Sequence, residues 1–432
     1  MFQTWNIVKD AASAPVYAQE APFKWSESIE TVLNMATKKE SSQGLMVLDG
    51  NRAAAHGVRL CRPDVICAYP ITPQTELLES LYLFQANQTI DAEFVAPEGE
   101  HSALSILRGA SAAGGRTFTA TSSQGLAFMF EVLVNVATTR LPIVMVNVAR
   151  EMIAPHSVTA GEQDIILVRD VGWIQIHNQS CQEILDSIIM AYRLAEDPDI
   201  RIPVIVCYDG YFLSHLWEPV EVPTQERVDR FLRPLEMYPR VDPDILMTCG
   251  PTTPSRMGTE FRYKQNAATQ RAKSKFEEIE KEFGLVFGRS YGGQIEEYRS
   301  EDAEVVLLAI GSCAGTAKVA VDRKRQEGKK VGLVTVRLYR PFPKERLLQA
   351  LKGKKAIGVI DRNVSFGWGC GALFSDLKTA LYDLGEFIPM TNFICGLCGS
   401  DITIEQIIRA IDLIDLSRQG KAFQEVTWLD LE

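Results

Sequence analysis

The stretch "DVICAYPITPQTELLESLYLF", residues 64–84, carries the pattern that decides the fold. Its beginning, "VICAYP", is as apolar as a buried strand, and "PQTELLESLYLF" has the apolar spacing of a helix. Between the two segments, Pro70 and Pro73 enclose Thr72, and because prolines fix the backbone this turn is predicted to be rigid. A strand that leads directly into a helix is the repeating unit of a parallel sheet covered by helices.

The same strand-to-helix unit recurs from residue 44 to residue 236. "EFVAPEGE" precedes the helical "HSALSILRGASAAG", and "TFTATSS" precedes "QGLAFMFEVLVNVATT", which predicts one long helix. "PIVMVNVAR" and "IPVIVCYDG" are apolar, β-branched runs of the kind that is buried inside a parallel sheet. These segments predict a doubly wound α/β domain over residues 44–236.

The rest of the chain divides into four further regions. Residues 1–43 predict an N-terminal extension, and residues 237–300 predict a linker with the charged helix "KQNAATQRAKSKFEEIEKEFG". Between residues 301 and 415, the strands "AEVVLLAIGS", "KKVGLVTVRLYRPFP" and "KKAIGVIDRN" predict a second α/β domain. It ends in the helix "DITIEQIIRAIDLI", capped by Asp or Thr, and residues 416–432 form a predicted tail.

The composition favours a soluble, globular, cytoplasmic protein. Hydrophobic residues make up 46% of the 432 residues and charged residues 23%, with a formal net charge of -10. No long basic run is present, which argues against nucleic acid as a partner, and no apolar run has the roughly 20 residues of a membrane span. The N-terminus lacks the pattern of a signal peptide, and the nine scattered cysteines predict reduced thiols.

A metal site in this chain is not expected. Cys395 and Cys398 form the one C-x-x-C pair, whereas a structural zinc or an iron–sulfur cluster usually takes four ligands. With 5 histidines and no H-E-x-x-H, a histidine-based metal site is not expected either. The sequence also lacks a P-loop and a G-x-G-x-x-G after a strand.

Four strand-to-helix junctions carry the polar residues that point to a ligand site. Ligands bind at the carboxyl ends of the strands in an open α/β sheet, and Thr72 follows such a strand. Thr72 is predicted to be the N-cap of the next helix, with Pro73 at the first helical position. The same geometry serves a plain cap or an anion site, and spacing leaves both interpretations open.

The other three junctions add one acid, several hydroxyls and one guanidinium. Glu100, in "VAPEGEHSALS", either caps a helix or holds a proton for a ligand. Ser123 and Gln124, in "TATSSQGLAF", lie in a turn where Gly125 permits close approach of a ligand. Arg150 follows an apolar strand and is either paired with an acid or directed at an anion. In a parallel sheet all four junctions line one edge.

These motifs resemble a known family. "GNRAAAHGVRLCRPDVICAYPITPQTE", "PEGEHSALSILRGASAAGGRTFTATSSQGLAFMFE", "RLPIVMVNVAR", "RDVGWIQ" and "YDGYFLSH" are similar to the alpha subunit of 2-oxoacid:acceptor oxidoreductases such as pyruvate:ferredoxin oxidoreductase, also called pyruvate synthase. The second α/β region resembles it through "AEVVLLAIGS", "VRLYRPFP", "VIDRNVSFGWGCGALFSDL" and "DITIEQI". The resemblance implies a thiamine-diphosphate-binding, pyrimidine-type domain followed by a transketolase C-terminal-like domain.

The resemblance also implies an activity and its cofactors. The family converts a 2-oxo acid and coenzyme A to an acyl-CoA and carbon dioxide, with thiamine diphosphate for the carbon chemistry. A beta subunit holds the diphosphate and magnesium, and iron–sulfur clusters on partner subunits, not in this chain, carry the electrons to ferredoxin. The implied partners are beta, gamma and ferredoxin-like delta subunits, so this chain is expected to supply half of an active site.

The resemblance assigns roles to individual residues. Glu100 matches the glutamate that hydrogen-bonds the aminopyrimidine ring of the cofactor. Thr72 and Arg150 match the threonine and the arginine that bind the substrate carboxylate. Ser123 and Gln124 are predicted to contact the cofactor.

Departures from the family pattern leave the substrate open. After Arg150 the family has a small Ala-Leu pair where this chain has Glu151 and Met152, and the loop "APHSVTAGEQD" differs as well. "GLCGSD" stands where the family has G-L-G-G-R-D. Pyruvate is the default substrate, and phenylglyoxylate, another aromatic 2-oxo acid or oxalate is the alternative. The electron acceptor is ferredoxin, or NAD if a flavin-bearing subunit is present. A non-catalytic scaffold subunit and a complete single-chain transketolase-like enzyme are the rival hypotheses.

Overall fold

The first domain is built on a seven-stranded sheet. The computed structural model describes residues 44–431 except residues 155, 237–238, 386 and 422–424, so the extension predicted at residues 1–43 lies outside the described residues. The strand order is β12-β6-β7-β5-β4-β2-β3, and only β12 runs antiparallel to its neighbour. The strands are β2 (Val65–Cys67), β3 (Glu93–Val95), β4 (Thr117–Thr121), β5 (Val144–Ala149), β6 (Ile174–His177), β7 (Val204–Asp209) and β12 (Leu338–Arg340).

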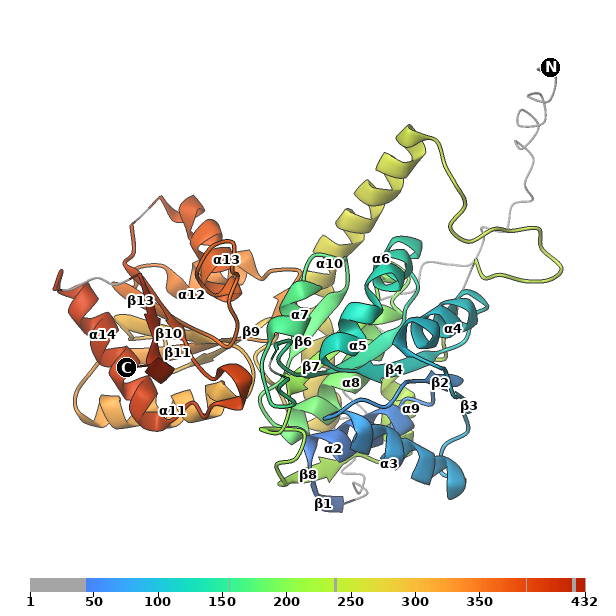
Figure 1. Ribbon diagram of the computed structural model, residues 1–432, viewed down its shortest axis with the longest axis horizontal. Coiled ribbons are helices and arrows are strands. Elements are labelled where there is room, and N and C mark those ends of the chain that lie inside the picture. Colours follow the sequence, from blue (N-terminus) through green and yellow to red (C-terminus); the bar gives the residue numbers. More distant parts are fainter. Residues whose placement is uncertain (1–43, 155, 237–238, 386, 422–424, 432) are drawn as a thin grey trace. The chain divides into compact units, whose positions relative to one another are not determined.

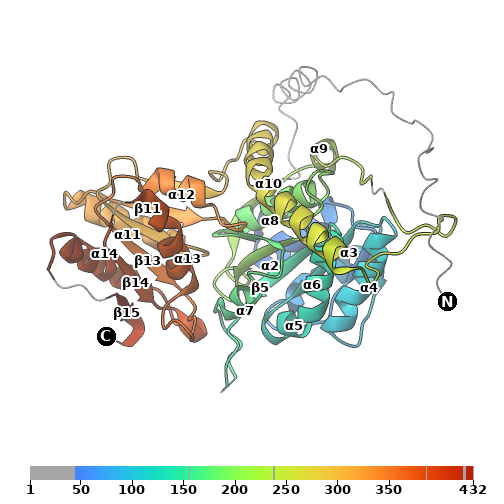
Figure 2. The ribbon, with the colours of Figure 1, turned by 90° about the horizontal axis from the view of Figure 1, so that it is seen from above.

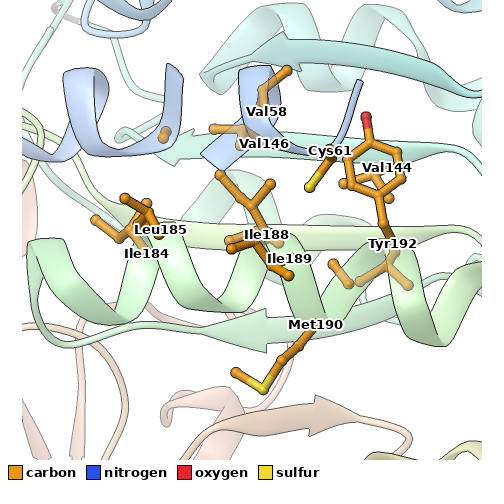
Figure 3. Packing of buried hydrophobic residues seen from close by; sticks show 14 of the residues in the cluster. Val58, Cys61, Val144, Val146, Ile184, Leu185, Ile188, Ile189, Met190 and Tyr192 are labelled. Atoms are coloured by element: carbon orange, nitrogen blue, oxygen red, sulfur yellow. The ribbon is translucent and has the colours of Figure 1, made fainter. Parts of the chain in front are cut away.

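Helices cover both faces of this sheet, as its continuous apolar strands predict. Along β5, Val144, Val146 and Val148 belong to one core cluster, whereas Met145 and Ala149 belong to the other, because successive side chains point to opposite faces. Figure 3 shows side chains from the first cluster, among them Val146 and Ile188. The helices are α2 (Gly50–Leu60), α3 (Thr75–Ala86), α4 (Glu100–Ala112), α5 (Ser123–Phe128), α6 (Phe130–Thr139), α7 (Gln163–Leu167), α8 (Cys181–Ala195) and α9 (Gln225–Phe231).

One helix predicted from the sequence is divided in the structure. The segment from Gln124 to Thr139 forms α5 and α6, which meet at Met129. Met129 has ψ -4°, far from the roughly -42° of an α-helix, so the hydrogen-bond ladder is interrupted there. Apolar periodicity continues across this break, which is why the sequence alone predicts one helix.

The region predicted as a linker contains α10 (Ser255–Phe287), a helix of 33 residues. Its later part buries an apolar stripe that includes Ala272, Phe276 and Phe283 in the core cluster of the first domain. The helix therefore packs onto the first domain with one face from Gln265 onward. None of the helices in the described ranges is both long enough and apolar enough to span a membrane.

The second domain has a six-stranded sheet with the order β15-β14-β13-β10-β11-β9, in which only β9 is antiparallel. Its strands are β9 (Ile295–Tyr298), β10 (Val305–Ala309), β11 (Val331–Val336), β13 (Ala356–Asp361), β14 (Met390–Ile394) and β15 (Val426–Trp428). β9 and β15 lie outside residues 301–415, the range that the sequence predicts for this domain, and β15 lies in the predicted tail.

Helices cover both faces of the second sheet as well (Figures 1 and 2). The predicted last helix has Thr403 as its N-cap, and the side chains of Thr403 and Gln406 form a reciprocal capping box. The helices are α11 (Cys313–Gln326), α12 (Lys344–Leu351), α13 (Ala372–Leu381) and α14 (Ile404–Arg418), with short 3-10 turns at η1 (Tyr382–Leu384), η2 (Leu397–Gly399) and η3 (Leu429–Leu431). A separate two-stranded antiparallel ribbon pairs β1 (Gly44–Leu48) with β8 (Glu218–Val222).

Candidate functional site

The carboxyl ends of β5, β4, β2 and β3 lie next to one another at one edge of the first sheet. These four strands are adjacent and parallel in the order given. Arg150 follows β5, Ser123 follows β4, Thr72 follows β2 and Glu100 begins the helix after β3. The four predicted junctions therefore meet at the edge where α/β sheets bind ligands.

Arg150 joins two of the other junctions. Its Nη1 donates to the carbonyl oxygen of Thr72 at 2.6 Å, and its Nη2 donates to Gln124 Oε1 at 2.8 Å. Nη2 also lies 3.3 Å from Nε2 of the exposed His156. The guanidinium is thus fixed between the turns that follow β2 and β4, with a histidine of the next loop beside it.

Arg150 has no acidic partner among the described residues. The side chain is only 3% exposed, yet no carboxylate forms an ion pair with it in that part of the chain, and its Nε is buried without a hydrogen-bond partner. Burial lowers the pKa of Arg150, and the negative charge of Asp164 opposes that shift. Since a buried charge is costly unless it is paired, this geometry favours an anion as its partner.

Thr72 does not cap the helix that follows it, so that prediction is wrong. Helix α3 begins at Thr75, with Gln74 at the N-cap position and no side-chain cap bond. The backbone N–H of Gln74 donates to the Ile71 carbonyl at 2.8 Å, so residues 71–74 form a turn before the helix starts. The Thr72–Pro73 peptide bond is cis, and the Thr72 side chain is exposed at the edge of the sheet.

Ser123 and Gln124 form the turn between β4 and α5. Ser123 has φ 50°, an uncommon value for a residue with a side chain. Its hydroxyl lies 2.6 Å from Gln124 Oε1 and 2.9 Å from the carbonyl oxygen of Glu151, and can donate to one of them at a time. The exposed Gln124 therefore links the Ser123 turn to Arg150.

Glu100 is the first residue of α4 and is 8% exposed. No hydrogen bond or ion pair holds its carboxylate within the described ranges. It lies directly against Gly125, where a Cβ would come 2.5 Å from Glu100 Oε1 and 2.4 Å from Thr121 Oγ1. Buried polar groups are nearly always hydrogen-bonded, so a carboxylate in this state is ready to accept a donor from a ligand.

Two hydroxyls of the same junction also lack partners. Thr121 Oγ1 and Ser122 Oγ are fully buried without a hydrogen bond in the described part of the chain. The Glu100 carboxylate fills the space beside Gly125, and with these two hydroxyls it forms a polar junction with unused hydrogen-bonding capacity, which suits a nitrogen-rich ring. The residues present therefore fit the pyrimidine half of thiamine diphosphate.

Asp164 in α7 is a buried residue of this edge that the sequence reasoning missed. It accepts hydrogen bonds from the backbone N–H of Ser123 at 2.8 Å, of Arg150 at 3.2 Å and of Ile165 at 2.7 Å. The Asn147 side chain donates to it at 3.1 Å. Burial raises the pKa of Asp164 to about 7, although these hydrogen bonds oppose the shift.

The loop after Arg150 differs from the family pattern, and its residues differ in how far they are exposed. Glu151 is buried, and its Oε2 lies 2.3 Å from the place where a Cβ on Gly161 would stand, so the side chain faces the loop. Burial raises the pKa of Glu151. Ile153 and His156 are exposed, and His156 is the one beside Arg150.

Cys395 and Cys398 differ in exposure in the structure. Cys395 is buried, whereas Cys398 is exposed in the η2 turn with φ 53°. Within the described residues, no group of three or more His, Cys, Asp or Glu side chains is placed to hold a metal ion.

Sequence comparison places both domains in one family. Residues 56–281 match the family described as "Pyruvate flavodoxin/ferredoxin oxidoreductase, thiamine diP-bdg". Residues 303–407 match "Pyruvate:ferredoxin oxidoreductase core domain II". The fold and the family matches thus define a thiamine-diphosphate-binding α/β domain with a second, transketolase C-terminal-like domain, which confirms the predicted fold class.

Relatives support the same assignment. The chain is 43% identical over 405 residues to the alpha subunit of NADH-dependent phenylglyoxylate dehydrogenase from Aromatoleum evansii, covering 92% of this chain and 97% of that one. It is 43% identical over 369 residues to pyruvate synthase subunit PorA from Methanosarcina barkeri, covering 85% of this chain and 92% of that one. The chain belongs to the alpha-subunit family of 2-oxoacid:acceptor oxidoreductases, as its motifs predict.

A solved structure shares the fold. It is 2-oxoglutarate:ferredoxin oxidoreductase from Magnetococcus marinus, with 2-oxoglutarate, coenzyme A and succinyl-CoA bound, at a TM-score of 0.66 and 21% identity. The match covers 85% of this chain and 65% of that one. At this identity the likeness concerns the arrangement of helices and strands.

Proposed function

We propose that this chain is the alpha subunit of a multisubunit, thiamine-diphosphate-dependent 2-oxoacid oxidoreductase. The complex converts a 2-oxo acid and coenzyme A to an acyl-CoA and carbon dioxide and releases two electrons and one proton. One observation carries the proposal: within the described residues a buried arginine has no acidic partner and a buried glutamate has no hydrogen-bond donor, and both lie at one sheet edge in a chain of this family. Substrate carboxylate and cofactor supply the two missing partners.

Arg150 and Thr72 bind the carboxylate of the 2-oxo acid in this proposal. Arg150 is already oriented by Thr72 O and Gln124 Oε1, so little side-chain freedom is lost when the acid binds. The guanidinium keeps N–H groups beyond those two contacts, and the exposed Thr72 hydroxyl adds a neutral donor beside it. The carboxylate therefore meets a charged donor and an uncharged donor at the same edge.

Glu100, Ser123 and Gln124 serve the cofactor. When bound, thiamine diphosphate supplies the carbon nucleophile for the keto group and accepts the electron pair left by decarboxylation. Glu100 accepts a hydrogen bond from the aminopyrimidine ring and holds a proton at its carboxylate. Gly125, by its lack of a side chain, leaves room for the Glu100 carboxylate in this position.

The remaining parts of the site belong to partner subunits. A beta subunit holds the diphosphate and magnesium, and gamma and ferredoxin-like delta subunits complete the complex. Iron–sulfur clusters on these partners pass the electrons to ferredoxin, or to NAD through a flavin subunit. A cytoplasmic location is part of the same proposal.

Pyruvate is the default substrate, and an aromatic 2-oxo acid such as phenylglyoxylate is the second candidate. Two observations favour the second candidate: the altered loop places His156 beside Arg150, and one relative is named a phenylglyoxylate dehydrogenase. Oxalate is the third candidate.

The test is a substrate assay on the purified complex. Coenzyme A, a viologen dye and the cofactor are supplied, with pyruvate, phenylglyoxylate, 2-oxoglutarate or oxalate in turn. Dye reduction is expected with pyruvate first, and a larger kcat/KM with phenylglyoxylate would select the aromatic candidate. Absence of dye reduction with all four acids would overturn the proposed function.

A second measurement tests the half-site. Binding of thiamine diphosphate to this chain alone and to the complex is compared by calorimetry. The complex is expected to bind tightly and the chain alone only weakly. Tight binding to the chain alone would support the single-chain, transketolase-like alternative instead.

A further inference from the structure

Asp164 uses both of its carboxylate oxygens to hold backbone and side-chain donors. Oδ2 accepts from the N–H groups of Ser123 and Arg150 and from Asn147 Nδ2, while Oδ1 accepts from the N–H of Ile165. The residue is fully buried. Its hydrogen bonds therefore bridge the ends of two neighbouring strands, since Ser123 follows β4 and Arg150 follows β5.

Ser123 and Arg150, the two residues that Asp164 bridges, both determine where the Arg150 guanidinium lies. The N–H bond from Ser123 supports that residue in its left-handed conformation, where a non-glycine residue is otherwise disfavoured. The position of Ser123 sets that of Gln124, whose Oε1 accepts from Arg150 Nη2. The backbone N–H of Arg150 donates to the same oxygen of Asp164, Oδ2, so Asp164 also holds the backbone that carries the guanidinium.

Only a carboxylate satisfies this arrangement. Donors face both oxygens, and an asparagine would turn either its carbonyl or its NH2 group toward each set. If the carbonyl faced Ser123 and Arg150, the NH2 group would face the N–H of Ile165, which now lies 2.7 Å from Oδ1. In either orientation at least one donor loses its acceptor, and a buried unsatisfied donor is costly.

We propose that Asp164 is a positioning residue that presets Arg150 for the substrate carboxylate by fastening the end of β4 to the end of β5. The inference rests on the proposed function, in which Arg150 binds that carboxylate. Asp164 touches neither substrate nor cofactor. It acts through the backbone of Arg150 and through the chain of contacts from Ser123 to Gln124.

The charge of Asp164 acts in the same direction. Among the causes of the Arg150 pKa, the carboxylate of Asp164 is the one that opposes the effect of burial most strongly. When ionised, Asp164 thus offsets part of the cost of burying the guanidinium without occupying its N–H groups. An ion pair made directly with those groups would compete with the substrate.

The second domain offers a matched control. Asp361 is also fully buried, and its carboxylate accepts hydrogen bonds from the N–H groups of Leu373 and Phe374 and from two asparagine side chains. Burial raises the pKa of Asp361 to about 6. Asp361→Asn therefore perturbs a similar buried network whose donors all belong to the second domain.

The experiment compares Asp164→Asn and Asp361→Asn in the purified complex. Both variants are expected to lower the melting temperature. Only Asp164→Asn is expected to raise the KM for the 2-oxo acid, by about tenfold or more, the effect of losing one hydrogen bond to a charged group. Its kcat and its KM for coenzyme A are expected to stay within about threefold of the wild type, because carboxylate binding is the step affected.

A second readout follows the backbone directly. Hydrogen exchange of peptides containing Ser123 and Arg150 is expected to quicken in Asp164→Asn and to stay unchanged in Asp361→Asn. If Asp164→Asn does not assemble, Asn147→Ala removes one donor to Oδ2 and is expected to give a smaller increase in KM and exchange.

The outcomes separate the two claims. If the wild-type complex is active but neither Asp164→Asn nor Asn147→Ala changes KM or exchange, the positioning role is wrong and the proposed function stands. A fall in kcat shared by both aspartate variants, with KM unchanged, would equally overturn the positioning role. If the wild type turns over none of the four acids, the proposed function fails and the inference fails with it.

Discussion

A substitution at Gly125 tests whether Glu100 is only a residue of its helix or a ligand of the cofactor. An alanine Cβ at this position would lie 2.4 Å from Thr121 Oγ1, 2.5 Å from Glu100 Oε1 and 3.0 Å from Glu100 Cδ. Ordinary van der Waals contact begins at 3.4 Å, so the neighbours would have to retreat by about 1 Å. Thr121 lies on a fully buried strand, which leaves the end of the Glu100 side chain as the part able to move.

The size of the effect follows from this displacement. Overpacking a well-filled site costs about 1–3 kcal/mol of stability. A catalytic group misplaced by about 1 Å can cost about a hundredfold in rate. Gly125→Ala is therefore expected to lower kcat/KM about a hundredfold while the subunit still folds.

The assay is 2-oxoacid- and coenzyme-A-dependent reduction of a viologen dye by the purified complex. Gly109→Ala is the control, because Gly109 lies in the neighbouring α4 with no atom within 4 Å of its Cβ position. The control is expected to keep full activity and to gain up to about 1 kcal/mol of stability. If Gly125→Ala matches Gly109→Ala in activity, Glu100 does not act where the structure places it.

Three further predictions rest on other contacts. Arg150→Lys keeps the charge but makes at most one of the two contacts, to Thr72 or Gln124, so the KM for the 2-oxo acid should rise at least about tenfold, and an unchanged KM would contradict a carboxylate role. Burial lowers the pKa of His177 from its usual 6.5 to about 4. The stability that depends on neutral His177 is therefore fully present above pH 6.5 and is lost as the pH falls toward 4. Urea unfolding should show about 2 kcal/mol less stability at pH 5 than at pH 7, and His177→Gln should remove this contribution to the difference. Thr403→Ala removes the capping box of α14 and should cost about 1 kcal/mol by the same urea measurement, whereas no change would mean that the cap is redundant.

The sequence predicts the main elements of the fold because their signals are local. Strand-to-helix units around Thr72, Glu100, Ser123 and Arg150 follow from apolar runs and turns, and parallel order then brings them to one edge. The family resemblance, which the comparisons confirm, gives the fold class of both domains. The roles of the individual site residues remain proposals.

The parts that sequence reasoning missed depend on contacts between distant residues. Asp164 bonds to Ser123, 41 positions away, and no periodic pattern marks that contact. The sequence predicts Thr72 as the N-cap of the next helix, but Gln74 occupies the N-cap position and Arg150 contacts the Thr72 carbonyl oxygen. Backbone acceptors of this kind carry no residue-type signal, so only the fold reveals them.

Glu100→Gln in the purified complex tests the proposed thiamine diphosphate site most directly. The control is Glu98→Gln, the same substitution two residues earlier, at an exposed glutamate that accepts from the Ser102 hydroxyl. Loss of the proton-holding carboxylate is expected to lower 2-oxoacid-dependent dye reduction by about a hundredfold to ten-thousandfold, with the control unchanged. Full activity in Glu100→Gln would contradict the claim that this chain supplies the glutamate of a thiamine diphosphate site.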